Sequence, residues 1–297
     1  MEQVSTVKKR DRGTRALILP SAAMLLFISI IPLCLLVLFS FVDGNVTVGR
    51  GIDGFTIGNF VRAFSSAMVP KLLGKSFLIS LIVTLICIGI GYPAAWAIAK
   101  VVKPQRRNIL VMMAAVPALI SQLLLIYTIM KLLQPGSVLM EPLARLGIIA
   151  DTDTILYSSK AVIFILVYEY LPYMILCLYS VLEKIDDRVL EAARTLGAGN
   201  YRIFRDIILP QSFPGLFSGI LIIFIPAAGS FVEPDIAGGP YGMMIGSLIN
   251  TQYNTSLNMG YGAALSLILL VLMALALLVI NFIMSTAERK IGGKINA

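Results

Sequence analysis

The sequence has no histidine, few charged residues and few cysteines. Only 13% of its 297 residues are Asp, Glu, Lys or Arg, and three are Cys. Without histidine, Ser–His and Cys–His catalytic pairs and the usual zinc-binding histidine pairs are impossible. Because Cys34, Cys87 and Cys177 are far apart in sequence, we expect neither a metal site nor a disulfide framework.

The sequence also lacks a phosphate-binding loop. The nearest tripeptide is Gly74-Lys75-Ser76, but Val69 stands where the motif needs its first glycine. No apolar run carries both Ser and Lys near its middle, so a Ser–Lys catalytic dyad is not expected either. The chain is therefore predicted to be no enzyme and to bind no cofactor itself.

Apolar residues are abundant, at 58% of the chain, and they are clustered. Six runs reach about 20 residues or more, the length that crosses a hydrocarbon core about 30 Å thick. They are 16–42, 76–100, 108–133, 160–182, 207–232 and 260–284. Because the runs are continuously apolar, they predict spanning helices rather than barrel strands. The fold class is therefore an all-α membrane protein with six transmembrane helices.

The first run is too long for the apolar part of a secretory signal, so we expect it to be retained as a span. Prolines inside the runs predict kinks, since neighbouring helices can satisfy the freed backbone groups. These prolines are Pro32, Pro93, Pro117, Pro172 and Pro226.

The basic residues predict the orientation. If the N-terminus is cytoplasmic, seventeen of the 24 Lys and Arg residues lie on the cytoplasmic side, where such residues accumulate. Both termini are therefore expected in the cytoplasm. This bias explains the net charge of +8 without a nucleic-acid partner.

The polar stretch between the fourth and fifth runs has helical order. Val189, Ala192, Ala193 and Leu196 recur at the spacing of one apolar helix face, and Asp186 or Asp187 can cap the helix start. The stretch 197–200, Gly-Ala-Gly-Asn, should end this helix in a turn.

A second short helix should follow this turn. Tyr201, Phe204 and Ile208 form its apolar side, and Pro210 marks the junction with the fifth span. Either the lipid surface or a groove on a soluble partner can receive such amphipathic helices.

The same stretch carries a recognisable motif. Glu191-Ala192-Ala193 is followed after three residues by Gly197, and after nine more by Ile207-x-Leu209-Pro210. This pattern resembles the EAA loop of binding-protein-dependent ABC importer permeases. The resemblance implies a type I ABC importer permease fold in which the loop 191–210 is a coupling helix docked on an ATPase. Glu191, Ala192 and Gly197 are the residues that we carry over from the family.

The resemblance also implies partners and a location. It implies a second permease subunit, a pair of cytoplasmic ATPases that bind ATP and Mg, and an extracytoplasmic solute-binding protein, with membrane lipid around the spans. The chain would lie in a bacterial cytoplasmic (inner) membrane, with a solute path between two permeases and alternating access. We expect one domain over 16–285, a disordered tail over 1–15, a cytoplasmic tail over 286–297, and ordered structure within 43–75.

Acidic residues suggest what is carried. Glu169 lies within the fourth run, where a carboxylate is costly in lipid, and Tyr168 and Tyr173 lie close to it in sequence. This group suits an organic cation, although Glu169 can equally serve structure by hydrogen-bonding a neighbouring helix. Phe231, Glu233 and Asp235 are expected at the outward mouth.

Further stretches resemble the spermidine/putrescine permease branch of this family. They are 91–96 (GYPAAW), 171–174 (LPYM), 229–234 (GSFVEP) and 238–240 (GGP). The chain departs from this pattern at 258–262, NMGYG, where a tryptophan is expected. The branch is similar to permeases for opines, aminoethylphosphonate and other small organic ions, and these remain alternatives. A secondary carrier is a further one, should no ATPase accompany the chain.

The motif gives a first testable prediction. A bulky residue at Gly197 is expected to abolish transport and leave the protein in the membrane, because the sharp turn needs glycine. Solute uptake and the amount of protein in the membrane fraction measure the two effects. Loss of the protein from the membrane would contradict this role.

Overall fold

The computed structural model describes residues 20, 24–42, 54–138, 140–145 and 155–292. The expectations for the tail 1–15, for part of 43–75 and for the end of the C-terminal tail fall outside these residues. The chain divides into two units, Met1–Ser66 with Thr251–Ile268, and Ala67–Asn250 with Leu269–Ala297. Each unit is described by itself.

The described part of the chain is helical apart from one isolated bridge between Val42 and Phe55. Among the described residues, four helices are long and apolar enough to cross a membrane: Met68–Val101, Ser159–Leu182, Asn200–Gly229 and Met259–Thr286. The first comprises α3 (Met68–Trp96) and η1 (Ala97–Val101), and the second is α7. The third comprises α9 (Asn200–Ile203), η3 (Phe204–Ile208) and α10 (Leu209–Gly229). The fourth belongs to α13 (Met259–Gly292). The predicted all-helical class is confirmed.

The third apolar run differs from the single kinked span that we expected. It forms α4 (Pro104–Ala115), η2 (Val116–Leu119) and α5 (Gln122–Leu133), with a 93° bend at the break. Pro117 lacks an N–H and its ring crowds the preceding turn, which explains why α4 tightens into a 3₁₀ turn and ends. The pair counts as a fifth span only if both halves are taken together.

The first and fifth runs also differ from expectation. The described part of the first run is a shorter apolar helix, Met24–Ser40. The fifth span begins at Asn200, so the second short helix of the polar loop continues into it without a junction at Pro210. The wider π-helical turn Phe204–Ile208 precedes this proline and gives its ring room that a regular α turn lacks.

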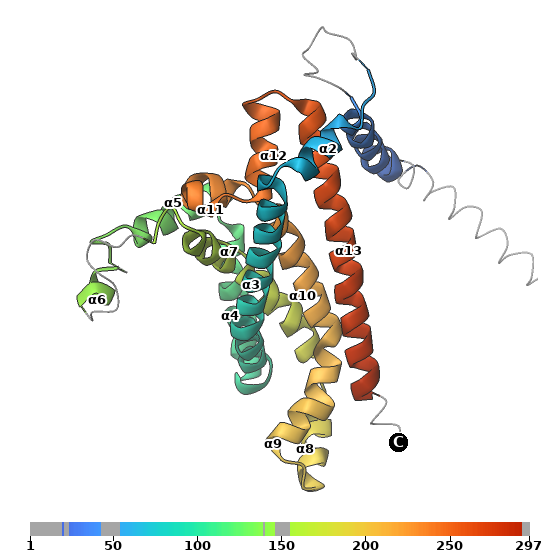
Figure 1. The fold of residues 1–297 in the computed structure, drawn as a ribbon. Helices are drawn as coiled ribbons and strands as arrows, with labels where there is room; N and C mark the ends of the chain where they lie inside the picture. Colours follow the sequence, from blue (N-terminus) through green and yellow to red (C-terminus); the bar gives the residue numbers. More distant parts are fainter. Residues whose placement is uncertain (1–19, 21–23, 43–53, 139, 146–154, 293–297) are drawn as a thin grey trace, which may run out of the picture. The chain divides into compact units, whose positions relative to one another are not determined.

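In the second unit, α3, α7 and α10 pack against one another (Figure 1). Their shared core includes Val83 of α3, Leu166 and Leu178 of α7, and Ile223 of α10. Lipid supplies no hydrophobic force between helices, so close backbone approach is needed for association. Gly215 and Gly219, spaced as G-x-x-x-G, provide this approach on α10. A Cβ at Gly215 would lie 2.7 Å from the Cys177 carbonyl oxygen of α7.

Short helices follow α10 in a stretch for which the sequence predicted no helix. They are η4 (Pro234–Gly238), α11 (Gly239–Gly242) and α12 (Ile245–Asn254). The backbone N–H of Ile245 donates to Ser76 Oγ of α3 at 2.9 Å. Ala237 shares an apolar cluster with Leu125 of α5 and Ile165 of α7. The stretch as far as Asn250 is therefore part of this packed unit, and the last residues of α12 belong to the first unit.

In the first unit, α2 (Gly58–Ser65) gives the described part of segment 43–75 the ordered structure that we expected. Asn59 Nδ2 of α2 donates to the carbonyl oxygens of Ser40 and Val42, at 3.2 and 2.9 Å. The Arg62 guanidinium lies 4.4 Å from the ring centre of Tyr261.

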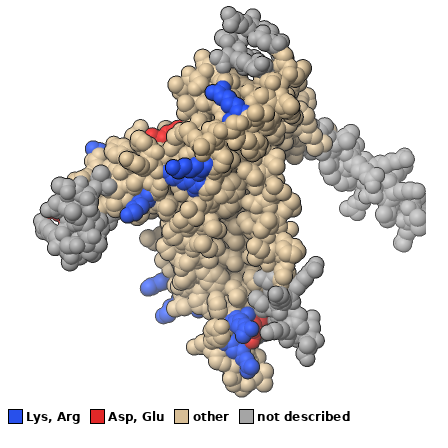
Figure 2. Space-filling model, viewed as in Figure 1, with Lys and Arg blue, Asp and Glu red and all other residues tan. Residues whose placement is uncertain are grey.

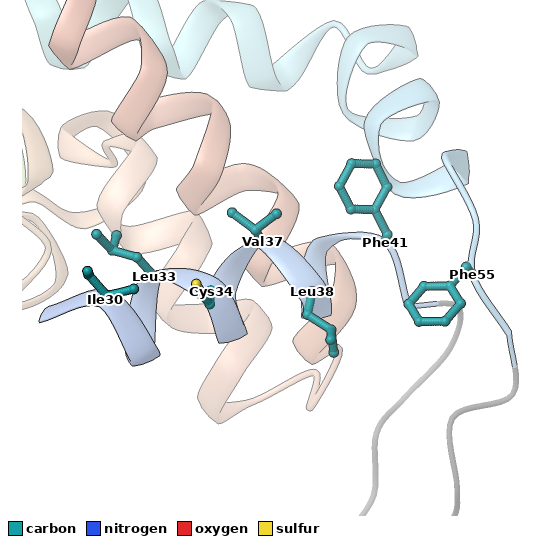
Figure 3. A pocket seen from close by; sticks show the side chains of 7 residues that line it. All are labelled: Ile30, Leu33, Cys34, Val37, Leu38, Phe41 and Phe55. Carbon is teal, nitrogen blue, oxygen red and sulfur yellow. The ribbon is translucent and has the colours of Figure 1, made fainter. Parts of the chain in front are cut away.

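An open apolar groove of about 550 Å³ runs along the helix Met24–Ser40 (Figure 3). Leu33 and Val37 of that helix line it together with Phe41 and Phe55. Its lining is almost entirely apolar, so it offers little to bind a charged solute.

The contact of α10 with α7 gives a prediction about stability. Gly215→Ala should destabilise the protein by about 1–3 kcal/mol, because a backbone carbonyl cannot move aside for the new methyl group. Thermal unfolding of the purified protein should show a lower Tm. Gly89→Ala in α3 is the control, since a Cβ there meets nothing within 4 Å. Equal Tm values for the two variants would contradict the packing argument.

Candidate functional site

The helix predicted at the EAA loop is α8 (Asp187–Thr195), and Asp186 caps it by accepting from the Arg188 N–H at 2.9 Å. Part of the apolar surface of α8 is buried in the core, and the rest of it is exposed. Leu190, which was not assigned to the predicted apolar face, is 7% exposed and packs into the core with Ala193. Val189, Ala192 and Leu196 are exposed, Leu196 by 88%. Part of the helix thus anchors it, and the other part is free to meet a partner.

The turn after α8 confirms the predicted helix end. Gly197 has φ +82°, a left-handed conformation that side chains other than glycine rarely adopt. Its N–H donates to the Arg194 carbonyl at 2.9 Å, and the Ala198 N–H donates to the Ala193 carbonyl at 3.0 Å. These two bonds form a Schellman motif. Gly199 has an ordinary φ of −70°, so Gly199→Val is the matched control for a bulky residue at Gly197.

The remaining motif residues lie on both sides of this turn. Glu191 is exposed on α8, and Ile207, Leu209 and Pro210 are half-buried in the helix that begins at Asn200. The apolar side predicted for that helix is not uniform. Tyr201 is 75% exposed, Phe204 lies edge-on to Tyr92 at 5.7 Å between ring centres, and Ile208 is buried.

A lysine attaches α8 to the end of the helix Met68–Val101. Lys100 Nζ donates to Asp187 Oδ1 at 2.7 Å and also to the Ile185 carbonyl oxygen. The Lys100 side chain is 6% exposed, whereas that of Asp187 is 62% exposed. One buried ammonium group therefore holds the start of α8 at a fixed place on the bundle.

A second polar cluster lies among the helices. Gln122 Nε2, at the start of α5, donates to Glu233 Oε1 at 2.6 Å and to Glu169 Oε1 at 3.2 Å. Ser230 Oγ donates to the other oxygen of Glu233, whose side chain is 1% exposed. Glu169 Oε2 is buried and accepts no hydrogen bond from any described residue.

This geometry brings together two carboxylates that the sequence placed in separate regions. Glu169 was expected within the fourth span and Glu233 at a mouth, but one amide joins them. The structural alternative for Glu169, a hydrogen bond to a neighbouring helix, is thus realised at one of its oxygens. The other oxygen still lacks a donor, and either a shared proton or a cationic group can stabilise two adjacent carboxyl groups.

The other four predicted candidates lie around this cluster without joining its hydrogen bonds. Tyr168 is 43% exposed and lines a separate groove of about 320 Å³ with residues of α5. Tyr173 is half-buried and its ring centre lies 6.3 Å from that of Tyr170. Phe231 is 42% exposed, and Asp235 is exposed and accepts from Asn250 Nδ2 at 3.0 Å.

Sequence reasoning missed Gln122, Ser230 and Asn250, the three side chains that donate to these acids. Gln122 left a signal, because an amide inside an apolar run is costly in lipid unless it has a partner. The other two lie in or beside the short helices after α10. Among the described residues, no group of His, Cys, Asp or Glu is arranged to hold a metal ion.

Comparison with known proteins identifies the family. Residues 87–293 match the family described as binding-protein-dependent transport system inner membrane component. The chain belongs to this family.

Curated relatives extend the match over most of the permease. The spermidine/putrescine transport system permease protein PotB of Haemophilus influenzae is 37% identical over 257 residues, covering 86% of this chain and 88% of the relative. PotB of Escherichia coli is 38% identical over 226 residues, covering 76% and 81%.

A crystal structure of a bacterial alginate ABC transporter shares the fold. Its TM-score is 0.72 at 17% identity, with 97% of this chain and 99% of that chain covered. The family match and the PotB relatives make this permease the transport component of an ABC system, a multi-pass protein of the inner membrane whose system includes a binding protein and an ATPase.

The buried lysine gives a prediction about coupling. Lys100→Met should lower solute uptake by about tenfold while the partner ATPase still hydrolyses ATP, because α8 loses its attachment to the bundle. Uptake and hydrolysis are measured in vesicles that contain the whole transporter. Lys103→Met is the control, since Lys103 is exposed nearby. Equal uptake by both variants would show that the attachment has no part in coupling.

Proposed function

We propose that this permease imports a polyamine such as spermidine or putrescine, and that Glu169 and Glu233 bind an ammonium group of the solute on its way. Relatives about 37–38% identical over most of the chain bear these solutes in their names. The observation that carries the proposal is the pair of carboxylates joined by Gln122, with Glu169 Oε2 left without a donor.

The chemistry of the cluster suits a primary ammonium group. Such a group has three N–H donors, and a carboxylate oxygen is its preferred acceptor. Glu169 Oε2 is an acceptor that already lacks a donor. Glu233 Oε1 becomes a second acceptor if the Gln122 amide moves and its hydrogen bond to this oxygen breaks. Tyr173 and Phe231 lie close by in sequence and supply aromatic faces for a passing cation. Asp235 is a further acid on the same route.

The proposed topology has six spans, with both termini in the cytoplasm. The helix Met24–Ser40 belongs to the first span, and the bent pair α4 and α5 forms the third. This orientation puts α8 and its basic neighbours on the cytoplasmic side, as the distribution of Lys and Arg favours. The family match supports membrane residence, and the charges support the direction.

The proposed assembly has this chain, a second permease, two ATPases and the solute-binding protein. A PotC permease of Haemophilus influenzae is 37% identical over 115 residues, which supports a related but different second permease. The ATPases hold ATP and Mg, and one of them receives the loop 191–210 through the exposed Ala192, Leu196 and Glu191. Closure of the ATPases then drives alternating access.

Competition for uptake tests the solute. Cells that express the complete transporter should take up labelled putrescine or spermidine, and an excess of either unlabelled polyamine should reduce that uptake. An opine or aminoethylphosphonate should not compete. Indifference to both polyamines would overturn the solute proposal and leave another small solute.

Variants of the two acids test the site in the same assay. Glu169→Gln and Glu233→Gln should each lower the rate of polyamine uptake by roughly 10–100-fold, since each removes a charge-assisted hydrogen bond to the ammonium group. Glu183→Gln is the control, because Glu183 follows α7 at its other end and is exposed. Full uptake by both acid variants would exclude them as a binding site.

A further inference from the structure

Three lysines lie at the end of the second unit that is opposite to α8. Lys71 and Lys75 are in the first two turns of α3, four residues apart and so on one face of the helix. Lys160 is the second residue of α7. Both helices run from this end towards the Lys100–Asp187 attachment. In the proposed topology this end faces outward.

One carbonyl group joins the elements that carry these lysines. The Tyr241 carbonyl oxygen of α11 accepts from Lys75 Nζ and, at 2.8 Å, from Ser159 Oγ at the start of α7. The Tyr157 N–H donates to the Ala237 carbonyl oxygen at 2.8 Å, which holds the residues before α7 against η4. The lysines are thus on a prearranged surface rather than on separate loops.

This surface, the lysine face, consists of Lys71, Lys75 and Lys160 with the rings of Tyr157 and Tyr241. The two rings are 54% and 80% exposed, and Lys71 and Lys160 are exposed as well. Figure 2 shows basic side chains on the molecular surface near the start of α3 and α11. Exposed tyrosines are typical of protein interfaces, where charged side chains lie at the polar rim rather than in the core.

The charge of this face needs a counterpart. Lys71 and Lys75 repel each other at their spacing, and within the described part of the chain no ion pair relieves any of the three lysines. Asp235, the exposed acid of η4, is held by the Asn250 amide instead. Basic residues are scarce on the outward side of membrane proteins, and these would repel a cationic solute. They therefore suit a partner of opposite charge.

We propose that the lysine face docks an acidic patch of the solute-binding protein. The inference rests on the proposed topology and on the family's dependence on a binding protein. Lysines at helix ends also reach lipid phosphates, which is the other source of negative charge here. The geometry favours a protein over lipid. Lys75 donates to the Tyr241 carbonyl oxygen, which holds this surface in one arrangement, and two exposed tyrosines belong to the same surface.

The test is a binding measurement on the complete transporter in nanodiscs of phosphatidylcholine. The probe is the solute-binding protein that supports solute uptake by this transporter. Lys71→Glu with Lys160→Glu should raise its Kd at least about tenfold and weaken the dependence of Kd on salt, because like charges now meet. Lys103→Glu with Lys184→Glu makes the same charge change at the α8 end and should leave Kd unchanged.

Several results would overturn the docking proposal. One is an unchanged Kd in the lysine-face variant, and another is a change seen only when phosphatidylglycerol is added to the nanodiscs, which would assign the face to lipid. If the glutamate pair does not assemble, Lys71→Gln with Lys160→Gln is measured and should raise Kd by a smaller factor. The Kd of the binding protein can be measured whatever solute the transporter carries. A failure of polyamines to compete for uptake would therefore leave this test of docking valid.

Labelling separates the topology from the docking proposal. A cysteine at Lys71 (Lys71→Cys) should react with a membrane-impermeant maleimide added outside whole spheroplasts. Reaction only after the membrane is opened would overturn both the proposed orientation and the docking surface.

Discussion

The hydrocarbon region of a membrane offers no hydrogen-bond partner, and this constraint decides where the chain can bend. Backbone groups there must be satisfied within helices or by other parts of the protein. The chain accordingly crosses in long helices, and at the 93° break between α4 and α5, where Leu119 is 85% exposed, the 3₁₀ turn Val116–Leu119 keeps part of the backbone hydrogen-bonded. The break leaves Gln122 at a helix start, where its amide joins Glu169 and Glu233. The polar cluster exists because the helix stops at this point.

Local signals made much of the fold and one site predictable. The length of the apolar runs indicates spanning helices, whatever the packing between them. The turn after α8 depends on six consecutive residues, 193–198, and Gly197 in it adopts a left-handed conformation, as expected for a glycine that ends a helix. Asp186 caps α8, one of the two residues expected to do so. Such features follow from the chain itself, so neighbours along the sequence are enough to predict them.

Contacts between distant residues were not predictable in this way. Glu169 and Glu233 are far apart in sequence, and only the packing of α5, α7 and η4 brings them to one amide. Leu190 replaced part of the expected apolar face of α8 because the core lies on that side. The G-x-x-x-G spacing of Gly215 and Gly219 was readable, but its partner helix was not. Assignment of a partner requires the three-dimensional arrangement.

The uninterrupted helix from Asn200 to Gly229 has a mechanical consequence. Its 30 residues span roughly 45 Å, so it behaves as a lever between the coupling turn and the interior. A tilt of about 5° around one end moves the other end by about 4 Å over this length. The next residue is Ser230, whose hydroxyl is bonded to Glu233. A movement of that size exceeds the 2.6 and 3.2 Å that separate Gln122 Nε2 from Glu233 and Glu169. In the proposed topology, a small rotation imposed from the cytoplasm would therefore separate Glu233 from Gln122.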